Sequence, residues 1–181
     1  MAEFFDEISD KLADFIASQP MFFTATACAT GRINLSPKGM DTFRVLNPKL
    51  CGYLDLTGSG NETAAHLKHD GRLTFMFNSF TRNPLILRLY GRGRVVRPHH
   101  ADFAGLASHF PTDLAGARQI VLMDVESVQT SCGYAVPEME LKAVRPTLVK
   151  WAETKGAETV VDYQARKNVT SIDGFPTGLM D

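Results

Sequence analysis

Cysteine is scarce in this sequence. Only three occur among 181 residues, Cys28, Cys51 and Cys132, and no two of them have C-x-x-C spacing. Thiols so few and so widely separated do not support a disulfide framework or a thiolate zinc site. We therefore expect a reducing compartment and no metal centre.

An excess of charge and long apolar runs are also missing. Nineteen Lys and Arg oppose twenty Asp and Glu, so no overall field would attract nucleic acid or an anionic membrane surface. No apolar run approaches the roughly 20 residues that span a bilayer. The first residues carry Glu3, Asp6, Glu7 and Asp10, the opposite of the basic start of an export signal. We expect a soluble, cytoplasmic protein with neither a nucleic-acid nor a membrane partner.

Motifs that name a catalytic residue are absent. The sequence has no G-x-S-x-G element, and no cysteine lies in a motif that marks a nucleophile. His66 and His69 are three residues apart, but no nearby cysteine or carboxylate completes a metal site. Hydrolysis by a protein nucleophile is disfavoured, and the sequence alone assigns no catalytic residue.

The length and the 44% of hydrophobic residues are sufficient for one domain with a substantial core. We predict a single domain over residues 1–181. Residues 1–128 would form a β-barrel with an N-terminal helix. Residues 129–181 would form a helical appendage and tail, since about fifty residues hold little core of their own.

Strand-like patterns dominate the middle of the chain. Apolar residues recur at three- and four-residue spacing from Phe4 to Ile16, which predicts an amphipathic helix ended by Pro20. Short helices are expected over 61–69 and 99–110, and two more through Trp151 and Tyr163. The strand-like runs are residues 21–29, 32–36, 42–46, 51–56, 73–78, 85–97 and 119–128. This order predicts a mainly β protein with flanking helices, either a largely antiparallel barrel or a sandwich.

The most informative segment is a strand that runs into a glycine-rich turn and a helix, residues 54–67. Gly58 and Gly60 would let the backbone approach a ligand closely. Ser59 and Glu62 have the spacing of a capping box, and Asn61 is a rival cap. The free N–H groups at the positive end of the helix would suit a phosphate, whereas the alternative is only a well-capped helix after a tight turn. The segment lacks the lysine of a P-loop.

Two further segments supply candidate ligand contacts. Ser36, Lys38 and Thr42 lie among apolar residues at a strand end, where a planar heterocycle would find hydrogen bonds, a cation and an apolar wall. Cations also recur along residues 72–97. The alternative for Arg92 and Arg94 is a solvated strand face.

The order of these motifs resembles a known family. N-L-S-P-K-G (34–39), D-T-F-R-V-L (41–46), Y-L-D-L-T-G-S-G-N-E-T (53–63) and L-R-L-Y-G-R-G-R-V (87–95) follow the succession seen in the pyridoxamine phosphate oxidase-related flavoproteins. S-C-G-Y-x-V-P (131–137) and K-N-x-x-S-I-D-G (167–174) are similar to one branch of that family. The resemblance implies a six-stranded antiparallel split β-barrel, the FMN-binding split barrel. It also implies a homodimer with two FMN molecules at its interface.

The motifs and the resemblance together give a set of candidate cofactor-binding residues. These are Ser36, Lys38, Thr42, Phe43, Arg44, Thr57, Ser59, Asn61, Thr63, Arg72 and Arg88. The sequence departs from the family pattern where Glu62 and Thr63 stand in place of an Arg-Lys pair that binds phosphate, and where Ile86 replaces a flavin-facing glutamine. The phosphate would then be bound by hydroxyl groups, backbone N–H groups and a cation from another part of the chain.

The expected function is that of an FMN-dependent oxidoreductase acting on an unknown small molecule, with NAD(P)H as a candidate reductant. Oxidation of pyridoxamine phosphate itself is not expected, because the C-terminal W…R-L-x-x-R pattern of the oxidase is missing. Two alternatives stay open. One is an F420-dependent reductase, and the other is a non-enzymatic module that binds flavin or haem.

Overall fold

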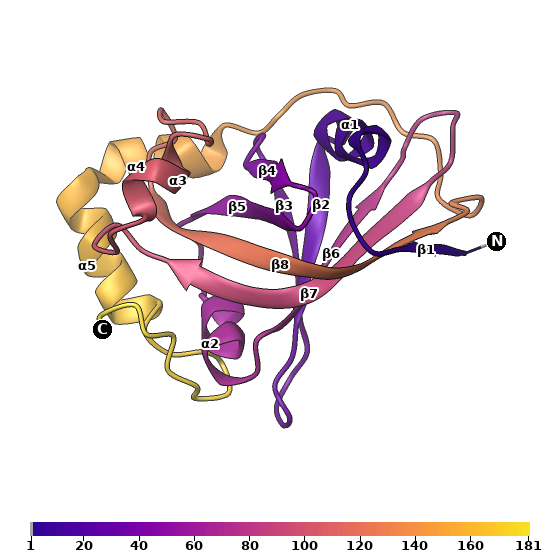
Figure 1. Cartoon of the computed structure of the whole chain (residues 1–181). Helices are drawn as coiled ribbons and strands as arrows, with labels where there is room; N and C mark the ends of the chain where they lie inside the picture. Colours follow the sequence, from indigo (N-terminus) through magenta and orange to yellow (C-terminus); the bar gives the residue numbers. More distant parts are fainter. Residues whose placement is uncertain (1) are drawn as a thin grey trace.

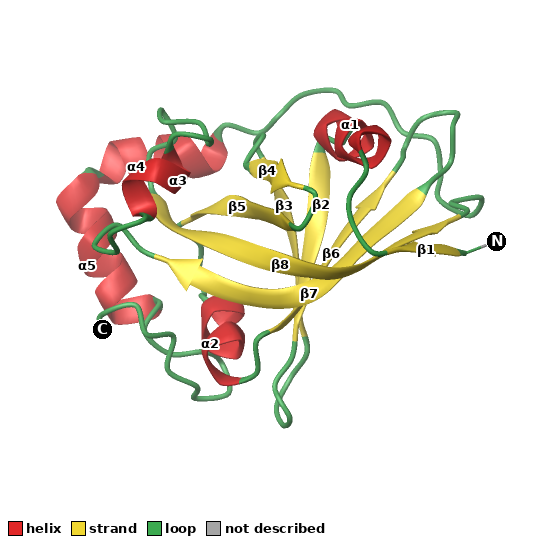
Figure 2. Ribbon diagram, in the orientation of Figure 1, coloured by secondary structure: helices red, strands yellow, loops and turns green. Residues whose placement is uncertain are grey.

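One curled antiparallel sheet forms the body of the protein in the computed structural model, which describes residues 2–181 (Figures 1 and 2). The strand order is β3-β2-β6-β7-β8-β5-β4, and β1 pairs separately with β8. The strands are β1 (Glu3–Phe5), β2 (Met21–Thr26), β3 (Asn34–Gly39), β4 (Phe43–Asn47), β5 (Leu50–Leu56), β6 (Arg72–Asn78), β7 (Ile86–Val96) and β8 (Ala117–Ser131). The sheet path ends at β3 and β4, so the barrel is split between them.

Five helices in the described part of the chain flank the sheet. They are α1 (Asp10–Ser18), α2 (Glu62–His69), α3 (Phe103–Ala107), α4 (Thr147–Lys155) and α5 (Ala157–Lys167). Helices α3, α4 and α5 lie together near one end of the barrel, and α2 lies close to the C-terminal tail (Figure 1). No helix within residues 2–181 combines the length and apolarity needed to cross a bilayer.

The predicted fold class is confirmed, with corrections at the N-terminus and in the strand count. The barrel has eight strands rather than six. Phe4 and Phe5 belong to strand β1, which pairs with Gln129 and Val128 of β8, and not to the predicted helix. The helix begins only after Ser9, whose side chain accepts a hydrogen bond from the Leu12 N–H and caps it. A strand of three residues is too short for its period to be distinguished from a helical one.

A second correction concerns the predicted helix over residues 99–110. Only Phe103–Ala107 is helical, and no side chain caps its start. His99 and His100 precede this short helix, with ring centroids 4.6 Å apart. A single helical turn of this kind is held by packing rather than by its own propensity.

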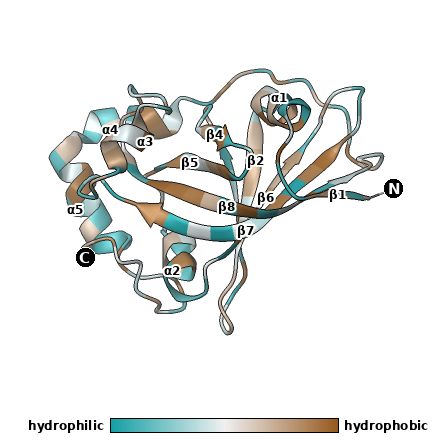
Figure 3. Ribbon diagram, in the orientation of Figure 1, coloured by the Kyte–Doolittle hydropathy of each residue, from teal (hydrophilic) through white to brown (hydrophobic). Residues whose placement is uncertain are grey.

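The core is built from the inward-facing residues of alternating strand positions. Leu87 and Leu89 of β7 and Phe75 and Phe77 of β6 are almost fully buried. The ring centroid of Phe22 of β2 lies 5.9 Å from that of Phe75 and 5.6 Å from that of Phe77. Helix α1 buries Leu12 and Ile16 against this cluster. Figure 3 shows that β8, which runs through the middle of the sheet, is hydrophobic over much of its length.

Candidate functional site

A polar cavity of about 290 Å³ lies between edge strand β3, strands β5 and β8, and the start of helix α2. We call it the seam pocket. It is lined by residues 34–38 of β3, Asp55 of β5, the turn 58–61, Glu62 and Thr63 at the start of α2, and Arg118 of β8. Strand alternation explains the lining, because the polar side chains of Asn34, Ser36 and Lys38 share one face of β3.

A buried carboxylate holds the cations of the seam pocket. Asp55 accepts from Arg118 Nη2 at 2.7 Å and from Gln119 Nε2 at 2.9 Å, and its other oxygen lies 3.2 Å from Lys38 Nζ. Burial would raise the pKa of Asp55, but the charges of Arg118 and Lys38 outweigh it and lower the pKa to about 2. The Asp55 carboxylate is therefore ionised across the physiological range and joins β3, β5 and β8.

Lys38 is the cation that remains available to a ligand. Burial would lower the pKa of its amine, yet the Asp55 charge raises the pKa overall, so the amine is fully protonated at neutral pH. Its side chain is 25% exposed, whereas the Arg118 side chain is 3% exposed. Arg118 also donates to the Gly60 carbonyl and to Asn168 Oδ1, so its donors are largely used within the protein.

The turn before α2 is held from behind by the C-terminal segment. Asn168 donates from Nδ2 to the Gly58 carbonyl at 3.2 Å, and its own carbonyl accepts from Asn61 Nδ2 at 3.3 Å. Asn61 Oδ1 accepts from Gln119 Nε2 at 2.8 Å. The turn is therefore a fixed element, and the Asn61 side chain is engaged inside the protein.

The predicted capping box does not form. No side chain caps α2, although Asn61 occupies the N-cap position. The Glu62 carboxylate instead accepts from the backbone N–H of Ile172, at 3.1 and 3.2 Å. The first N–H groups of an α-helix have no carbonyl partner within the helix. Those of α2 remain at the edge of the seam pocket, where the helix dipole favours an anion.

The structure brings part of the predicted set together. Ser36, Lys38, Ser59, Asn61 and Thr63 line the seam pocket. Asn34, between them, donates to Thr63 Oγ1 at 3.1 Å. Five of the eleven predicted positions are thus neighbours in space, although they come from a strand, a turn and a helix.

Phe43, Thr42 and Arg44 lie outside the seam pocket. Phe43 is partly buried and packs against the core, with its ring centroid 5.0 Å from that of Phe75. Thr42 is buried and donates to the Gly39 carbonyl. Arg44 pairs with Asp41 at 2.9 Å and donates to the His109 carbonyl.

Thr57, Arg72 and Arg88 also lie outside it. Thr57 donates to the Gly116 carbonyl behind the turn. Arg72 makes two bonds to Asp70. Arg88 donates to Ser131 Oγ on the outer face of the sheet.

Sequence reasoning missed Asp55, Arg118, Gln119 and Asn168. Asp55 was a weak signal on its own, a single carboxylate within the apolar strand Y-L-D-L. An ionised group in such a strand requires a partner, because an unpaired buried charge is strongly unfavourable. The partner, Arg118, is 63 residues away, and no local pattern identifies it.

A family model described as pyridoxamine 5'-phosphate oxidase matches residues 8–132. The chain belongs to the pyridoxamine 5'-phosphate oxidase family. The family prediction is thereby confirmed. The matched range contains the whole seam pocket as defined above, but it ends before Asn168.

Known relatives agree with this membership. The pyridoxamine 5'-phosphate oxidase family protein ustO of Aspergillus flavus is 39% identical over 193 residues, covering 97% of this chain and 78% of that protein. Among solved structures, HupZ of Group A Streptococcus has a TM-score of 0.54 at 19% identity, covering 68% of this chain and 99% of its own. A candidate pyridoxamine 5'-phosphate oxidase from Lactobacillus delbrueckii has a TM-score of 0.54 at 14% identity, covering 68% and 94%. Both structures share the fold.

Proposed function

We propose that the protein is an FMN-dependent oxidoreductase of this family that acts on a small molecule, and that the seam pocket binds the FMN phosphate. The observation that carries the proposal is the arrangement of the pocket at the start of α2. It combines a protonated, partly exposed Lys38 with helix N–H groups in a cavity of about 290 Å³.

The residues of the seam pocket fit a phosphate. Asp55 is paired with Arg118, so Lys38 retains donors that a phosphate oxygen can accept. Ser36 and Ser59 add hydroxyl donors at the same rim. Thr63 adds another hydroxyl next to the first turn of α2. These groups replace the Arg-Lys pair that the sequence lacks.

Bound flavin would supply the hydride or electron transfer, and the chain would supply position and electrostatics. Lys38 and the α2 N–H groups would fix the phosphate end. The turn held by Asn168 would keep that end at a constant distance from the sheet. The Asp55–Arg118 pair would keep Lys38 in place by fixing its partner.

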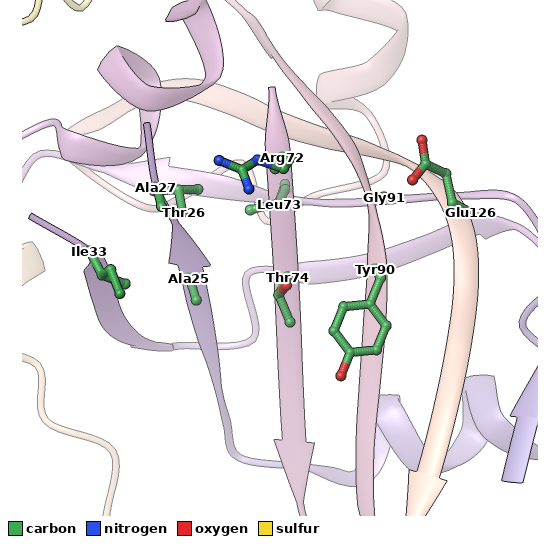
Figure 4. A pocket seen from close by; sticks show the side chains of 10 residues that line it. All are labelled: Ala25, Thr26, Ala27, Ile33, Arg72, Leu73, Thr74, Tyr90, Gly91 and Glu126. Carbon is green, nitrogen blue, oxygen red and sulfur yellow. The ribbon is translucent and has the colours of Figure 1, made fainter. Parts of the chain in front are cut away.

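We further propose that the protein is a homodimer that pairs through the outer face of β3, β2, β6 and β7. Ile33 and Leu35 are apolar yet 78% and 65% exposed. Figure 4 shows Ile33, Thr74 and Tyr90 beside a hollow on this face, which Arg72 and Glu126 also line. The hollow has a volume of about 340 Å³. Exposed apolar residues next to a hollow with charged groups at its border are typical of an interaction surface.

Sedimentation equilibrium is expected to give the mass of a dimer, and Leu35→Arg is expected to shift it to a monomer. An arginine there would bury an unpaired charge at the interface. Lys11→Arg, on helix α1, serves as the control and leaves the dimer intact. A monomeric wild-type protein would contradict this part of the proposal.

The activity is tested by the redox behaviour of the flavin-loaded protein. FMN bound to the protein should be bleached by NADPH or NADH without oxygen and should return to yellow when oxygen is admitted. A bound flavin that neither nicotinamide reduces, and that reoxidises no faster than free flavin, would favour a non-enzymatic carrier. Preferential binding of F420 over FMN would favour the deazaflavin alternative.

Replacing Glu62 with glutamine is expected to tighten FMN binding by about 3- to 10-fold, because one negative charge is removed from the rim of a phosphate pocket. Glutamine keeps an oxygen that can accept from the Ile172 N–H. Fluorescence titration of FMN measures the change, with riboflavin, which lacks the phosphate, as the control ligand. Equal gains for both flavins would place the phosphate elsewhere.

A further inference from the structure

A second cavity, of about 360 Å³, lies on the other side of the turn that borders the seam pocket. Its distinctive lining is Leu148 and Trp151 of α4 and Tyr163 of α5. The Trp151 and Tyr163 rings meet edge to face with centroids 5.2 Å apart, so each holds the other in position. None of the charged side chains in residues 2–181 lines this cavity, which we call the aromatic groove.

Two residues are common to both cavities. Gly58 and Ser59 line the aromatic groove and also the seam pocket. A Cβ added at Gly58 would meet no atom within 4 Å, and the Ser59 side chain is exposed, so no other part of the protein covers the ridge at Gly58. This open space at Gly58 is where a ligand that occupies both cavities would cross.

The ridge is also rigid. The Gly58 carbonyl accepts from Asn168, and Thr57 Oγ1 accepts from Gln164 Nε2 of α5 at 2.7 Å. The Thr57 N–H and hydroxyl both donate to the Gly116 carbonyl. These bonds fix α5, and with it Tyr163, relative to the turn. The two cavities thus keep one relative position, which a single ligand spanning both would require.

We propose that the aromatic groove binds the adenine of a flavin adenine dinucleotide whose pyrophosphate occupies the seam pocket and crosses the Gly58–Ser59 ridge. The proposal rests on the proposed function, since the seam pocket must first hold the flavin phosphate. The groove adjoins that phosphate end. A substrate that exchanges electrons with the flavin must contact the isoalloxazine ring instead, so the adjacent groove suits a group attached through the phosphate.

The lining matches the chemistry of adenine. Adenine is flat and uncharged, and its faces stack on aromatic side chains. Trp151 is half-buried and thus retains surface for a ligand. Leu148 is 36% exposed and adds an apolar wall. The protein would accept FMN through the seam pocket alone and would hold the dinucleotide more tightly because both cavities are filled.

The test compares FAD with FMN by fluorescence titration of protein freed of flavin, in the wild type and in Trp151→Ala. The wild type should bind FAD about 10-fold more tightly than FMN, a typical effect of one base stacked on an aromatic side chain. Trp151→Ala should remove this preference and leave the FMN affinity within about 2-fold. Val161→Ala on the exposed face of α5, which does not line the groove, should retain the preference.

Retained FMN affinity also shows that Trp151→Ala is folded. Wild-type protein that binds FMN but shows no preference for FAD would overturn this inference and leave the proposed function standing. An equal loss of FMN and FAD affinity in folded Trp151→Ala would also overturn it, because the groove would then hold the flavin ring. Binding of neither flavin by the wild type would overturn both.

Discussion

Replacing Asp55 with alanine is expected to lower the free energy of unfolding by about 3 to 5 kcal/mol. Asp55 is 2% exposed and balances the buried Arg118 at 2.7 Å and Lys38 at 3.2 Å. Its removal would leave the Arg118 guanidinium as an uncompensated buried charge. Urea unfolding followed by circular dichroism measures the loss.

The matched control is Asp124→Ala. Asp124 also pairs with an arginine, Arg94, at 2.8 Å, but the two side chains are 64% and 47% exposed. An exposed pair of this kind contributes less than about 1 kcal/mol. If Asp55→Ala and Asp124→Ala lowered the free energy of unfolding by similarly small amounts, the bonds of Asp55 to Arg118 and Lys38 would not hold β3, β5 and β8 together.

The pairing of Asp55 with Arg118 and Lys38 makes the free energy of unfolding depend on pH in a defined way. The folded-state pKa of Asp55 is about 2, below the roughly 3.9 of an unfolded aspartate, so its contribution is fully present above pH 4 and is lost as the pH falls toward 2. That difference corresponds to about 2 to 3 kcal/mol. The difference in the free energy of unfolding between the wild type and Asp55→Asn should therefore decrease as the pH falls from 4 to 2. A difference that stays constant from pH 6 to pH 2 would contradict the assigned ionisation of Asp55.

Asn168→Ala has the second largest expected effect. Asn168 is 0% exposed, and its side chain donates to the Gly58 carbonyl and accepts from Arg118 at 2.7 Å. The buried Arg118 and the partly buried Gly58 carbonyl would each lose a hydrogen bond, which should lower the free energy of unfolding by about 2 to 4 kcal/mol. Because the turn would also loosen, the FMN affinity should fall by about 10-fold.

The control for Asn168 is Asn47→Ala at an exposed position, where the side chain accepts only from the Lys49 N–H. This variant should lose less than about 1 kcal/mol and retain its FMN affinity. If Asn168→Ala lost stability with no change in FMN affinity, Asn168 would support the fold without positioning the turn.

The sequence predicted those parts of the site that follow from local pattern. The strand end that carries Ser36 and Lys38 and the glycine segment at 58–60 are visible in short windows. The order of strand, glycine segment and helix is found as predicted. The strand predicted over residues 32–36 instead runs from Asn34 to Gly39. Strands β2, β6 and β7 were also predictable, because each buries alternate residues along most of its length.

The rest depends on contacts between distant parts of the chain. Asn168 donates to the Gly58 carbonyl, 110 residues away in the sequence. Glu62 accepts from the Ile172 N–H at the same sequence separation and does not form the predicted capping box. The capping-box pattern considers only the residues at the helix end, so it does not include a competing donor from the C-terminal tail. Likewise, nothing in the local sequence of Phe43 distinguishes a core ring from a ligand wall, and the structure packs this partly buried ring against the core cluster.

The most direct test of the seam pocket is the ratio of the riboflavin and FMN dissociation constants, measured for the wild type and for Lys38→Met. The two flavins differ only by the phosphate. The wild type should bind FMN at least about 30-fold more tightly than riboflavin, and Lys38→Met should reduce this ratio by about 10-fold without weakening riboflavin. A wild-type ratio near one, or a ratio unchanged by Lys38→Met, would contradict the account.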